Sequence, residues 1–419
     1  MSRRPDLHET PAVLVGLDSM QGLQAARILH GRGVPVYAFA KDPTNDACRT
    51  NVCREIRFAD TRSDDLIPAL EALGRKLGKR AVLFPCEDQN VLVVSRFRDR
   101  LAEWYHIALP PHDVVEMLMD KTRFYRHAQE AGLPIPPTHF LRSRDELDAV
   151  AAALRFPVIL KPANSATRLW EKNCMVSAFK VSDLEELYDL YDRFHTFSEA
   201  LIVQEWIAGP DSNLYSCNCY FDRTGRPVVT FVARKLRQWP PHVGKSSFGV
   251  EVRSDEVREE TIRLFESVGY RGLGYVEFKL DERHGRQFIV EPNVGRPTGR
   301  SAIAEAGGVE LLYTMYCDLL GLPLPADREQ AYGGAKWVHL RRDLQSAIYY
   351  WRRGDLTLGE WLRSWRGKKA FALFSWSDPM PFLSDLRRVA WTVVSPGQRR
   401  KRRRKMTGAP PRTAPSRTT

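Results

Sequence analysis

Short apolar runs alternate with amphipathic segments through the first 110 residues. Runs that predict β-strands lie at 12–17 (AVLVGL), 34–40 (VPVYAFA) and 81–86 (AVLFPC). Segments with apolar residues at helical spacing lie at 23–33, 64–77 and 94–101. Strands that alternate with helices predict a parallel sheet with helices packed on it. We therefore expect an α/β domain over residues 1–110.

A second pattern, richer in strands than in helices, runs from residue 111 to residue 330. Helices are predicted at 121–132, 145–154, 183–194 and 255–268. Strands are predicted at 156–163, 175–181, 201–207, 215–221 and 227–236, followed by a hairpin of 272–280 and 286–293 around the turn DERHG. Strands joined by short turns pair antiparallel. We therefore expect an α+β domain with mixed or antiparallel sheets.

The chain changes character after residue 330. Six of the ten tryptophans lie within residues 331–395, interleaved with arginines, and we find no catalytic motif there. The last segment, 396–419, consists mainly of Pro, Arg, Ser and Thr, a composition that predicts disorder. We therefore expect a Trp- and Arg-rich C-terminal extension at 331–395 and a disordered basic tail after it.

The net charge of +12 is concentrated in this tail. Arg399 to Lys405 reads RRKRRRK, and with Arg412 and Arg417 this segment carries nine of the twelve charges, so residues 1–398 carry only the remaining three. Three interpretations of the tail remain: a solvated end, a tether to an anionic membrane, or a nucleic-acid contact. The neighbouring Trp- and Arg-rich segment favours a membrane over nucleic acid, which is not expected as a partner.

Composition and the cysteines place the protein among cytoplasmic enzymes. Hydrophobic residues make up 43% of the chain and charged residues 27%, as in ordinary globular proteins. The seven cysteines form an odd set without a CxxC pair, which is typical of free thiols in a reducing compartment. We see neither a signal peptide nor an apolar stretch that could span a bilayer. We expect a cytoplasmic protein, with the tail as a candidate for peripheral contact with the inner membrane surface.

The predicted hairpin carries the most informative polar residues. Glu291 and Asn293 lie two positions apart on one strand and therefore share a face. If the turn centres near His284, Glu277 lies opposite Glu291. Two carboxylates in that position repel each other unless a cation lies between them, and oxygen ligands of this kind suit Mg²⁺. The alternative is an ordinary solvated polar face.

Two lysines and one strand end add further candidates. Lys161 ends the apolar run FPVILK, and Lys121 opens a predicted helix; each could also be a lysine with a packed stem and a solvated head. The run LIVQEWIAGPD ends at Glu205 to Ile207 and turns at Gly209. Such a strand end can present backbone groups to a flat heterocycle, although it could equally be a strand leaving the core.

Taken in order, these features resemble the ATP-grasp superfamily over about 310 residues. The order is a βαβ domain, a lysine opening a helix, a lysine ending a strand, the Q-E-φ-I segment followed by G-x-D, a basic cluster, and E…E-x-N. The phrases KPANSA, ARKLRQWP and EPNVGRP are most similar to carboxylate–amine ligases such as D-aspartate ligase. The resemblance implies an ATP-dependent enzyme that activates a carboxylate as an acyl phosphate, joins it to an amine, and releases ADP and phosphate.

The same resemblance implies a role for each motif residue. ATP would be held through its phosphates by Lys121, Lys161 and Ser165, through adenine by Glu205 and the Ile207 backbone, and through ribose by Asp211. Arg234 and Lys235 would face the triphosphate or acyl phosphate, and Arg296 and Arg300 the acyl intermediate. One or two Mg²⁺ ions, with Mn²⁺ as an alternative, would bind Glu277, Glu291 and Asn293.

The chain departs from the family pattern at two places. The loop after Lys161, residues 163–174, contains no glycine, and Gly295 stands where many members have an arginine. Glu87 and Asp88, just after a predicted strand, either touch substrate or form an ordinary acidic loop. Two other functions remain open: an ATP-grasp carboxylase or carbamoyl-phosphate-type enzyme, and a non-catalytic nucleotide-binding module with a membrane-surface tail.

Overall fold

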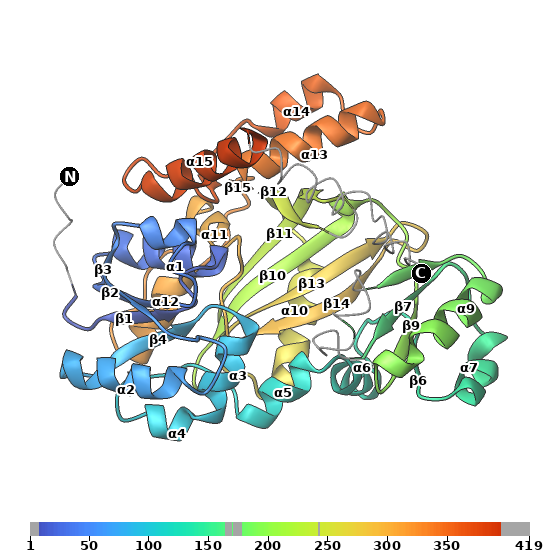
Figure 1. Cartoon of the computed structure of the whole chain (residues 1–419), viewed down its shortest axis with the longest axis horizontal. Helices are drawn as coiled ribbons and strands as arrows, with labels where there is room; N and C mark the ends of the chain where they lie inside the picture. Colours follow the sequence, from blue (N-terminus) through green and yellow to red (C-terminus); the bar gives the residue numbers. More distant parts are fainter. Residues whose placement is uncertain (1–7, 164–169, 171–177, 242–243, 395–419) are drawn as a thin grey trace, which may run out of the picture.

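The computed structural model describes residues 8–163, 170, 178–241 and 244–394. Its N-terminal part is a parallel sheet in the order β3-β2-β1-β4-β5 (Figure 1). The strands are β1 (Ala12–Val15), β2 (Val36–Ala40), β3 (Cys53–Phe58), β4 (Ala81–Pro85) and β5 (Tyr105–His106), and the helices are α1 (Met20–Gly31), α2 (Leu66–Leu77), α3 (Asp88–Arg96) and α4 (Arg98–Leu101). Val13 and Leu14 belong to different hydrophobic clusters, so both faces of the sheet are covered.

A small antiparallel sheet follows, in the order β6-β9-β7-β8. Its elements are β6 (Thr138–Leu141), α7 (Arg144–Ala151), β7 (Val158–Pro162), β8 (Phe179–Val181), α9 (Leu184–Phe194) and β9 (Leu201–Glu205). Two helices connect it to the first domain, α5 (His112–Met119) and α6 (Lys121–Glu130). Asp120 caps α6 by accepting a hydrogen bond from the Arg123 backbone N–H, so Lys121 stands at the first position of the helix.

The central sheet has seven strands in the order β14-β13-β10-β11-β12-β15-β16. They are β10 (Leu214–Phe221), β11 (Pro227–Trp239), β12 (Lys245–Glu251), β13 (Gly272–Asp281), β14 (Arg286–Val294), β15 (Lys336–Val338) and β16 (Lys369–Phe371), with helices α10 (Asp255–Glu266), α11 (Ala302–Ala306) and α12 (Leu311–Leu319). The pairs from β14 to β15 are antiparallel, and β15 pairs parallel with β16. The predicted fold class, a parallel α/β domain followed by mixed and antiparallel sheets, is confirmed.

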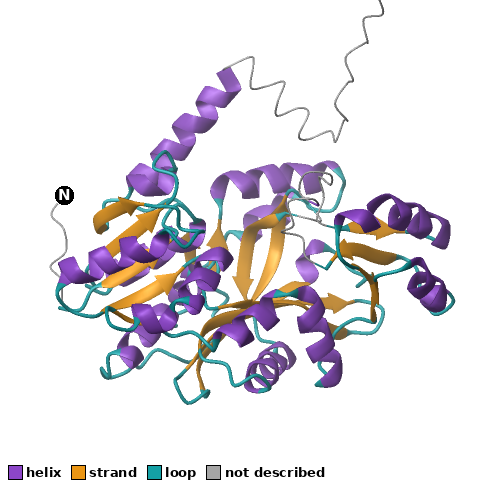
Figure 2. Cartoon of the chain, turned by 60° about the horizontal axis from the view of Figure 1, so that its bottom comes forward, coloured by secondary structure: helices purple, strands orange, loops and turns teal. Residues whose placement is uncertain are grey.

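The C-terminal extension is built into this architecture. Its strands β15 and β16 extend the central sheet, and its helices are α13 (Leu340–Arg352), α14 (Leu358–Ser364) and α15 (Met380–Val394). Arg237 of β11 pairs with fully buried Asp343 of α13 at 2.6 Å, and Arg27 of α1 pairs with fully buried Asp378 at 2.8 Å. Breaking one partner of such a buried pair is strongly destabilising. Figure 2 shows the C-terminal end of α15 projecting from the molecule, while Ser384 and Arg388 of this helix bind Asp46 of the first domain.

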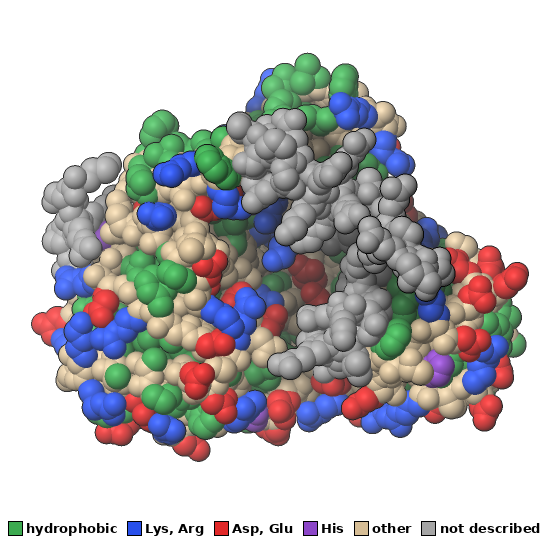
Figure 3. Space-filling view, in the orientation of Figure 1, with side chains coloured by type: hydrophobic (Ala, Val, Ile, Leu, Met, Phe, Trp, Pro, Cys, Tyr) green, Lys and Arg blue, Asp and Glu red, His purple; other side chains and the backbone are tan. Residues whose placement is uncertain are grey.

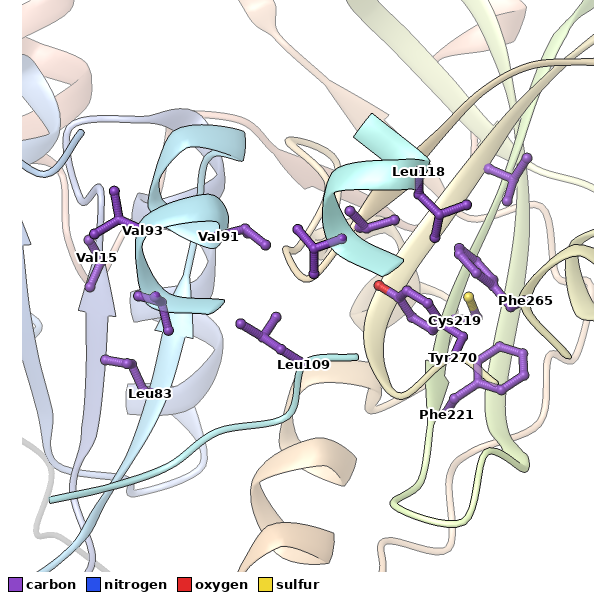
Figure 4. Packing of buried hydrophobic residues seen from close by; sticks show 14 of the residues in the cluster. Val15, Leu83, Val91, Val93, Leu109, Leu118, Cys219, Phe221, Phe265 and Tyr270 are labelled. Carbon is purple, nitrogen blue, oxygen red and sulfur yellow. The ribbon is translucent and has the colours of Figure 1, made fainter. Parts of the chain in front are cut away.

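One hydrophobic cluster crosses from the first domain to the central sheet. Figure 4 shows Val91 and Leu109 on one side and Leu118 and Tyr270 on the other, and all belong to the same buried set. This shared core fixes the first domain against the sheet that carries the predicted metal ligands. Among the helices of the described residues, none has the length and apolar character needed to cross a membrane.

Candidate active site

A cavity of about 680 Å³ lies where three parts of the chain meet. The first domain contributes Asp18, Glu87 and Asp88. The central sheet contributes Lys235, Glu277, Glu291 and Asn293, and the segment that follows β14 contributes Arg296 and Arg300. The C-terminal extension contributes a third set, which includes His339, Arg341 and Arg342. Figure 3 shows acidic and basic side chains together in the recess between the lobes. Six residues predicted as metal ligands or catalytic groups therefore line one cavity.

Glu277 and Glu291 lie directly opposite each other across β13 and β14, as predicted. The ladder shifts by one residue next to this pair, because Phe278 pairs with Ile289 and leaves Val290 as an extra residue. The protein packed around Glu291 and the nearby Glu277 carboxylate raise the pKa of the Glu291 carboxyl group, although its side chain faces the open cavity. A cation between the two carboxylates would relieve their repulsion.

Asn293 is positioned by Arg296, which is buried. Arg296 donates to Asn293 Oδ1 at 2.6 Å, to Tyr275 Oη at 2.8 Å and to Asp88 Oδ1 at 2.5 Å. The buried Asn293 Nδ2 has no hydrogen-bond partner among the described residues. This arrangement leaves one lone pair on Asn293 Oδ1 and a free N–H donor beside the carboxylates. The sequence allowed two interpretations of Asp88, a substrate contact or part of an ordinary acidic loop. In the structure Asp88 lines the cavity and binds Arg296.

Gly295 explains one departure from the family pattern. Its φ is +68°, a conformation that favours glycine, and a Cβ there would lie 2.5 Å from Leu109 Cδ2 and 2.6 Å from Val91 Cγ1. A larger residue at this position would require the side chains of Leu109 and Val91 to move. Arg296, the next residue, points into the cavity instead.

Lys161 is buried at the end of β7, and its ammonium has two neutral partners. Nζ donates to Tyr125 Oη and to Gln204 Oε1, both at 2.9 Å, and lies 4.6 Å from the centre of the Tyr125 ring. Burial lowers the pKa of Lys161 to about 8, and the Glu291 carboxylate opposes this shift. Tyr125 Oη in turn donates to the carbonyl of Val290, the extra residue of the hairpin, at 2.8 Å. Lys161 is therefore connected to the strand that carries Glu291.

Lys121 lies in the same electrostatic environment. Burial and, second, the Lys161 ammonium lower the pKa of Lys121, while Glu291 raises it.

The sequence did not identify Tyr125 and Gln204 as partners of Lys161. Tyr125 stands four positions after Lys121 on α6, which places the two side chains on one helix face, and this spacing is a signal that could have indicated the connection.

The predicted adenine and ribose residues lie outside the large cavity. Glu205 and Ile207 line a separate pocket of about 400 Å³, where Arg283 donates to Glu205 Oε1 at 3.0 Å. Asp211 accepts a hydrogen bond from Tyr350 Oη of α13 at 2.5 Å. Ser165 and the glycine-free loop 163–174 lie outside the described residues, apart from Ala163 and Trp170.

The neighbouring basic residues of β11 have different surroundings. Arg234 Nη2 donates to Asn213 Oδ1 at 3.3 Å, and its guanidinium also contacts the Ser212 carbonyl. Lys235 lines the large cavity and donates to Gln238 Oε1 at 3.1 Å. Burial lowers the pKa of Lys235, and Glu277 opposes the shift. Adjacent residues of a strand point to opposite faces, so only Lys235 shares the cavity with the paired carboxylates.

Arg300 completes this wall of the cavity. Its Nη2 donates to Ser216 Oγ at 2.9 Å and lies 3.9 Å from Glu277 Oε1. Within the described part of the chain, no group of three or more His, Cys, Asp and Glu side chains could hold a metal ion. A metal in this cavity would therefore depend on the two carboxylates, the Asn293 amide and oxygens of a bound molecule.

Comparison with curated proteins shows similarity to two kinds of ligase. The chain is 27% identical over 232 residues to D-aspartate ligase of Enterococcus faecium, covering 54% of this chain and 55% of the relative. It is 27% identical over 212 residues to D-alanine–D-alanine ligase of Methylococcus capsulatus, covering 46% of this chain and 62% of the relative. The chain thus spans less than two thirds of the length of these relatives. No protein-family model matches it.

Solved structures with a similar fold cover more of the chain. An ADP complex of N5-carboxyaminoimidazole ribonucleotide synthetase gives a TM-score of 0.62 at 14% identity, over 84% of this chain and 87% of that one. Biotin carboxylase of Campylobacter jejuni gives a TM-score of 0.59 at 16% identity, over 77% of this chain and 74% of that one. The chain shares the fold of these structures. The resemblance inferred from the sequence is confirmed, and the two relatives named above are ligases.

Proposed function

We propose that this protein is an ATP-dependent ligase that activates a carboxylate as an acyl phosphate and joins it to an amine. The observation that carries the proposal is the pair Glu277 and Glu291, which faces a cavity that also holds Lys235, Arg296 and Arg300. Phosphoryl transfer depends on positioning and charge neutralisation, and a site of paired carboxylates and cations supplies both. The ligase relatives support the same reaction class.

In this proposal ATP lies against the elements around β7 and β9. Lys121 and Lys161 bind its phosphates, together with Ser165 of the loop that follows β7. Glu205 and the Ile207 backbone bind adenine, and Asp211 binds the ribose. The electrostatic coupling of both lysines to Glu291 supports a phosphate site next to the paired carboxylates.

The residues present fit Mg²⁺. Glu277 and Glu291 offer carboxylate oxygens from opposite strands, and Asn293 Oδ1 keeps one lone pair beside its bond to Arg296. Bound there, Mg²⁺ would neutralise charge on the transferring phosphoryl oxygens, and Mn²⁺ could use the same oxygen ligands. A structural neighbour, the biotin carboxylase domain of a 2-oxoglutarate carboxylase, was solved with MgADP.

The reaction proceeds in two displacements. A carboxylate oxygen of the substrate attacks the γ-phosphorus, and the bond between that phosphorus and the bridging oxygen breaks, so ADP leaves with the electron pair. The amine nitrogen then attacks the acyl carbon, phosphate leaves, and the nitrogen loses its proton to solvent. Lys235, Arg296 and Arg300 neutralise the negative charge of the acyl phosphate within the cavity.

The test measures ADP release with candidate acids and amines, beginning with D-aspartate and D-alanine because the relatives are named for them. We expect ADP release that requires a carboxylate and increases with an amine. Release that requires bicarbonate instead would identify the carboxylase alternative. Nucleotide binding without turnover under all these conditions would identify a non-catalytic module.

We further propose that the outer face of the C-terminal helices contacts an anionic membrane surface. Among the described residues, ten of the fourteen exposed large hydrophobic side chains lie from residue 344 onward, and Trp376 is 83% and Trp391 71% exposed. Figure 3 shows hydrophobic side chains over the C-terminal helices at the top of the view. Residues of α13 and α14 also line an apolar groove of about 280 Å³. The sequence after α15 carries the seven basic residues 399–405. Apolar area beside basic charge is the combination that binds anionic lipid.

A further inference from the structure

The C-terminal extension lines the same cavity as the proposed catalytic residues. Strand β15 and the start of α13 contribute Trp337, His339, Arg341 and Arg342 to its wall. His339 is only 3% exposed, and its backbone N–H donates to the Ser247 carbonyl of β12 at 2.9 Å. This contact fixes the first turn of α13 against the central sheet. The side chains of this turn are therefore held in place rather than displayed on a loose appendage.

Most arginines of the cavity are neutralised by a carboxylate. Arg296 pairs with Asp88 at 2.5 Å, Arg341 with Asp385 at 3.1 Å, and Arg388 with Asp46 at 2.7 Å. Arg342 differs, because its side chain is half-buried and forms no hydrogen bond or ion pair with any residue that the structure describes. A partly desolvated cation without an anion is an unfavourable arrangement, which an anionic ligand would relieve.

The surroundings of Arg342 include a neutral imidazole. Burial, and then the adjacent arginines, lower the pKa of His339 to about 3, so its imidazole is neutral at pH 7. Burial and Arg341 also lower the pKa of Arg342, while Asp385 raises it. The planar guanidinium of Arg342 can donate two N–H groups to an oxyanion, and the neutral imidazole beside it adds no second positive charge.

We propose that Arg342, with His339 beside it, forms an anion subsite of the cleft, which binds a second carboxylate or a phosphate group of the substrate. The substrate of the proposed ligase would then be at least a dianion, with one carboxyl group activated at the Glu277–Glu291 end and the other anionic group held by α13. Arg342 lies on α13, whereas the proposed triphosphate ligands Lys121 and Lys161 lie on α6 and β7 and do not line this cavity. The substrate assignment rests on the proposed function, whereas the subsite rests on the cavity.

The experiment is calorimetric titration of the full-length protein with three probes: succinate, 3-phosphonopropionate and propionate. We expect both dianions to bind at least about tenfold more tightly than propionate, because a charge-assisted contact to the second anionic group is lost in the monoanion. The stronger of the two dianions identifies the oxyanion as carboxylate or phosphate. Arg342→Gln should reduce dianion binding to the level of propionate. Arg352→Gln, at the exposed end of the same helix, should not change it.

Equal succinate affinity in the wild type and in Arg342→Gln, with equal melting temperatures, would overturn the proposal. If Arg342→Gln does not fold, Arg342→Lys replaces it and should weaken dianion binding severalfold, because the charge remains but the planar fork is lost. The anion subsite and the ligase function can each be disproved without disproving the other. Ligase turnover that prefers D-alanine to D-aspartate would remove the subsite and keep the ligase. Dianion binding that depends on Arg342, in a protein without carboxylate-dependent ADP release, would keep the subsite and remove the ligase.

Discussion

Tyr350 Oη donates a hydrogen bond to Asp211 Oδ2 at 2.5 Å. The bond joins α13 of the C-terminal extension to the residue proposed to bind the ribose, across 139 positions of sequence. Burial and the Asp211 carboxylate raise the pKa of Tyr350, so the phenol keeps its proton at any physiological pH. The tyrosine is therefore a permanent donor, which occupies one oxygen of Asp211 and orients the other.

The first prediction follows from this orientation. Tyr350→Phe should weaken ATP binding about threefold to tenfold, less than the loss of a direct hydrogen bond to a charged group, because Tyr350 acts on ATP only by orienting Asp211. Asp211→Asn should also weaken ATP binding, and the double variant should lose less than the two single losses combined, because the residues act as one unit. Tyr349→Phe is the matched control. Unchanged nucleotide affinity in Tyr350→Phe, measured by calorimetry, would contradict the role of Tyr350.

Replacement of Lys161 tests the phosphate site. Lys161→Met keeps most of the side-chain volume but removes the ammonium that contacts Tyr125 and Gln204. We expect ATP affinity to fall by about tenfold or more, since a charge-assisted contact to phosphate contributes about 1.5–3 kcal/mol. Lys79→Met, on the exposed surface of the first domain, should bind ATP as the wild type does. Equal affinities in the two variants would remove Lys161 from the site.

The lowered pKa of Lys161 predicts that ATP binding is coupled to protonation of this lysine. The free protein loses the Lys161 proton as pH rises through about 8, whereas the unfolded chain keeps it to about 10.4. ATP phosphates favour the ammonium, so ATP binding above pH 8 should be accompanied by proton uptake, and affinity should fall as pH rises. Calorimetry in buffers of different ionisation enthalpy measures this uptake. Lys161→Met should reduce it, and the part that remains would come from Lys121, whose pKa is also lowered.

The lowered pKa of Lys161 also affects the stability of the folded protein, which should rise with pH where ATP affinity falls. Between pH 8 and about 10.4 the unfolded chain binds more protons at Lys161 than the folded protein does, so the contribution of Lys161 to stability rises with pH in this window. Below pH 8 both states are protonated, and the full cost of burying the charge is present. Without ATP, Lys161→Met should therefore lose this part of the pH dependence, which urea unfolding at several pH values can measure.

The hairpin shows how far local sequence reasoning reaches. Alternation and the DERHG turn predicted both strands, and the predicted opposition of Glu277 and Glu291 is correct, although the physical reason is different. Asp281 pairs with Arg286, and this register alone would place Glu277 opposite Val290. The bulge at Val290 moves Glu291 into position. Such a bulge depends on contacts such as the one from Tyr125, which no local pattern contains.

Long-range packing explains what the sequence left out. Strand β3 (CREIRF) was not predicted, because charged residues interrupt its apolar positions. The part of the C-terminal extension that lines the cavity was not predicted either, since Arg237 and Asp343 meet across 106 positions. The reason for Gly295, where the family pattern led us to expect an arginine, is visible only in the packing against Leu109 and Val91.

The membrane proposal predicts that binding needs both the tail and the exposed tryptophans. The full-length protein should bind vesicles that contain phosphatidylserine but not neutral vesicles, and high salt should weaken this binding. Removal of residues 396–419, or Trp376→Ser with Trp391→Ser, should each reduce it at least about tenfold. The melting temperature and ADP release in solution should stay unchanged in the truncated protein. Equal vesicle binding by the full-length and truncated forms would leave the solvated tail as the explanation.

The last prediction concerns the acyl phosphate. If Glu277, Glu291 and Asn293 hold Mg²⁺ beside the transferring phosphoryl group, the first product is a mixed anhydride that hydroxylamine can capture. ATP, Mg²⁺ and the correct carboxylate should then yield a hydroxamate even without the natural amine. Glu291→Gln should remove most of this yield, because it takes away one of two opposed carboxylates and weakens the metal site.

Two further measurements separate a metal effect from a loss of structure. Glu259→Gln, which changes an exposed carboxylate on α10, should leave the hydroxamate yield unchanged. Raising the Mg²⁺ concentration should restore part of the yield in Glu291→Gln, since a weakened site fills at higher metal concentration. Carboxylate-dependent ADP release that never gives hydroxamate would argue against an acyl phosphate. In that case the γ-phosphoryl group would be transferred to another acceptor, and the cavity would have to position that group instead of a carboxylate.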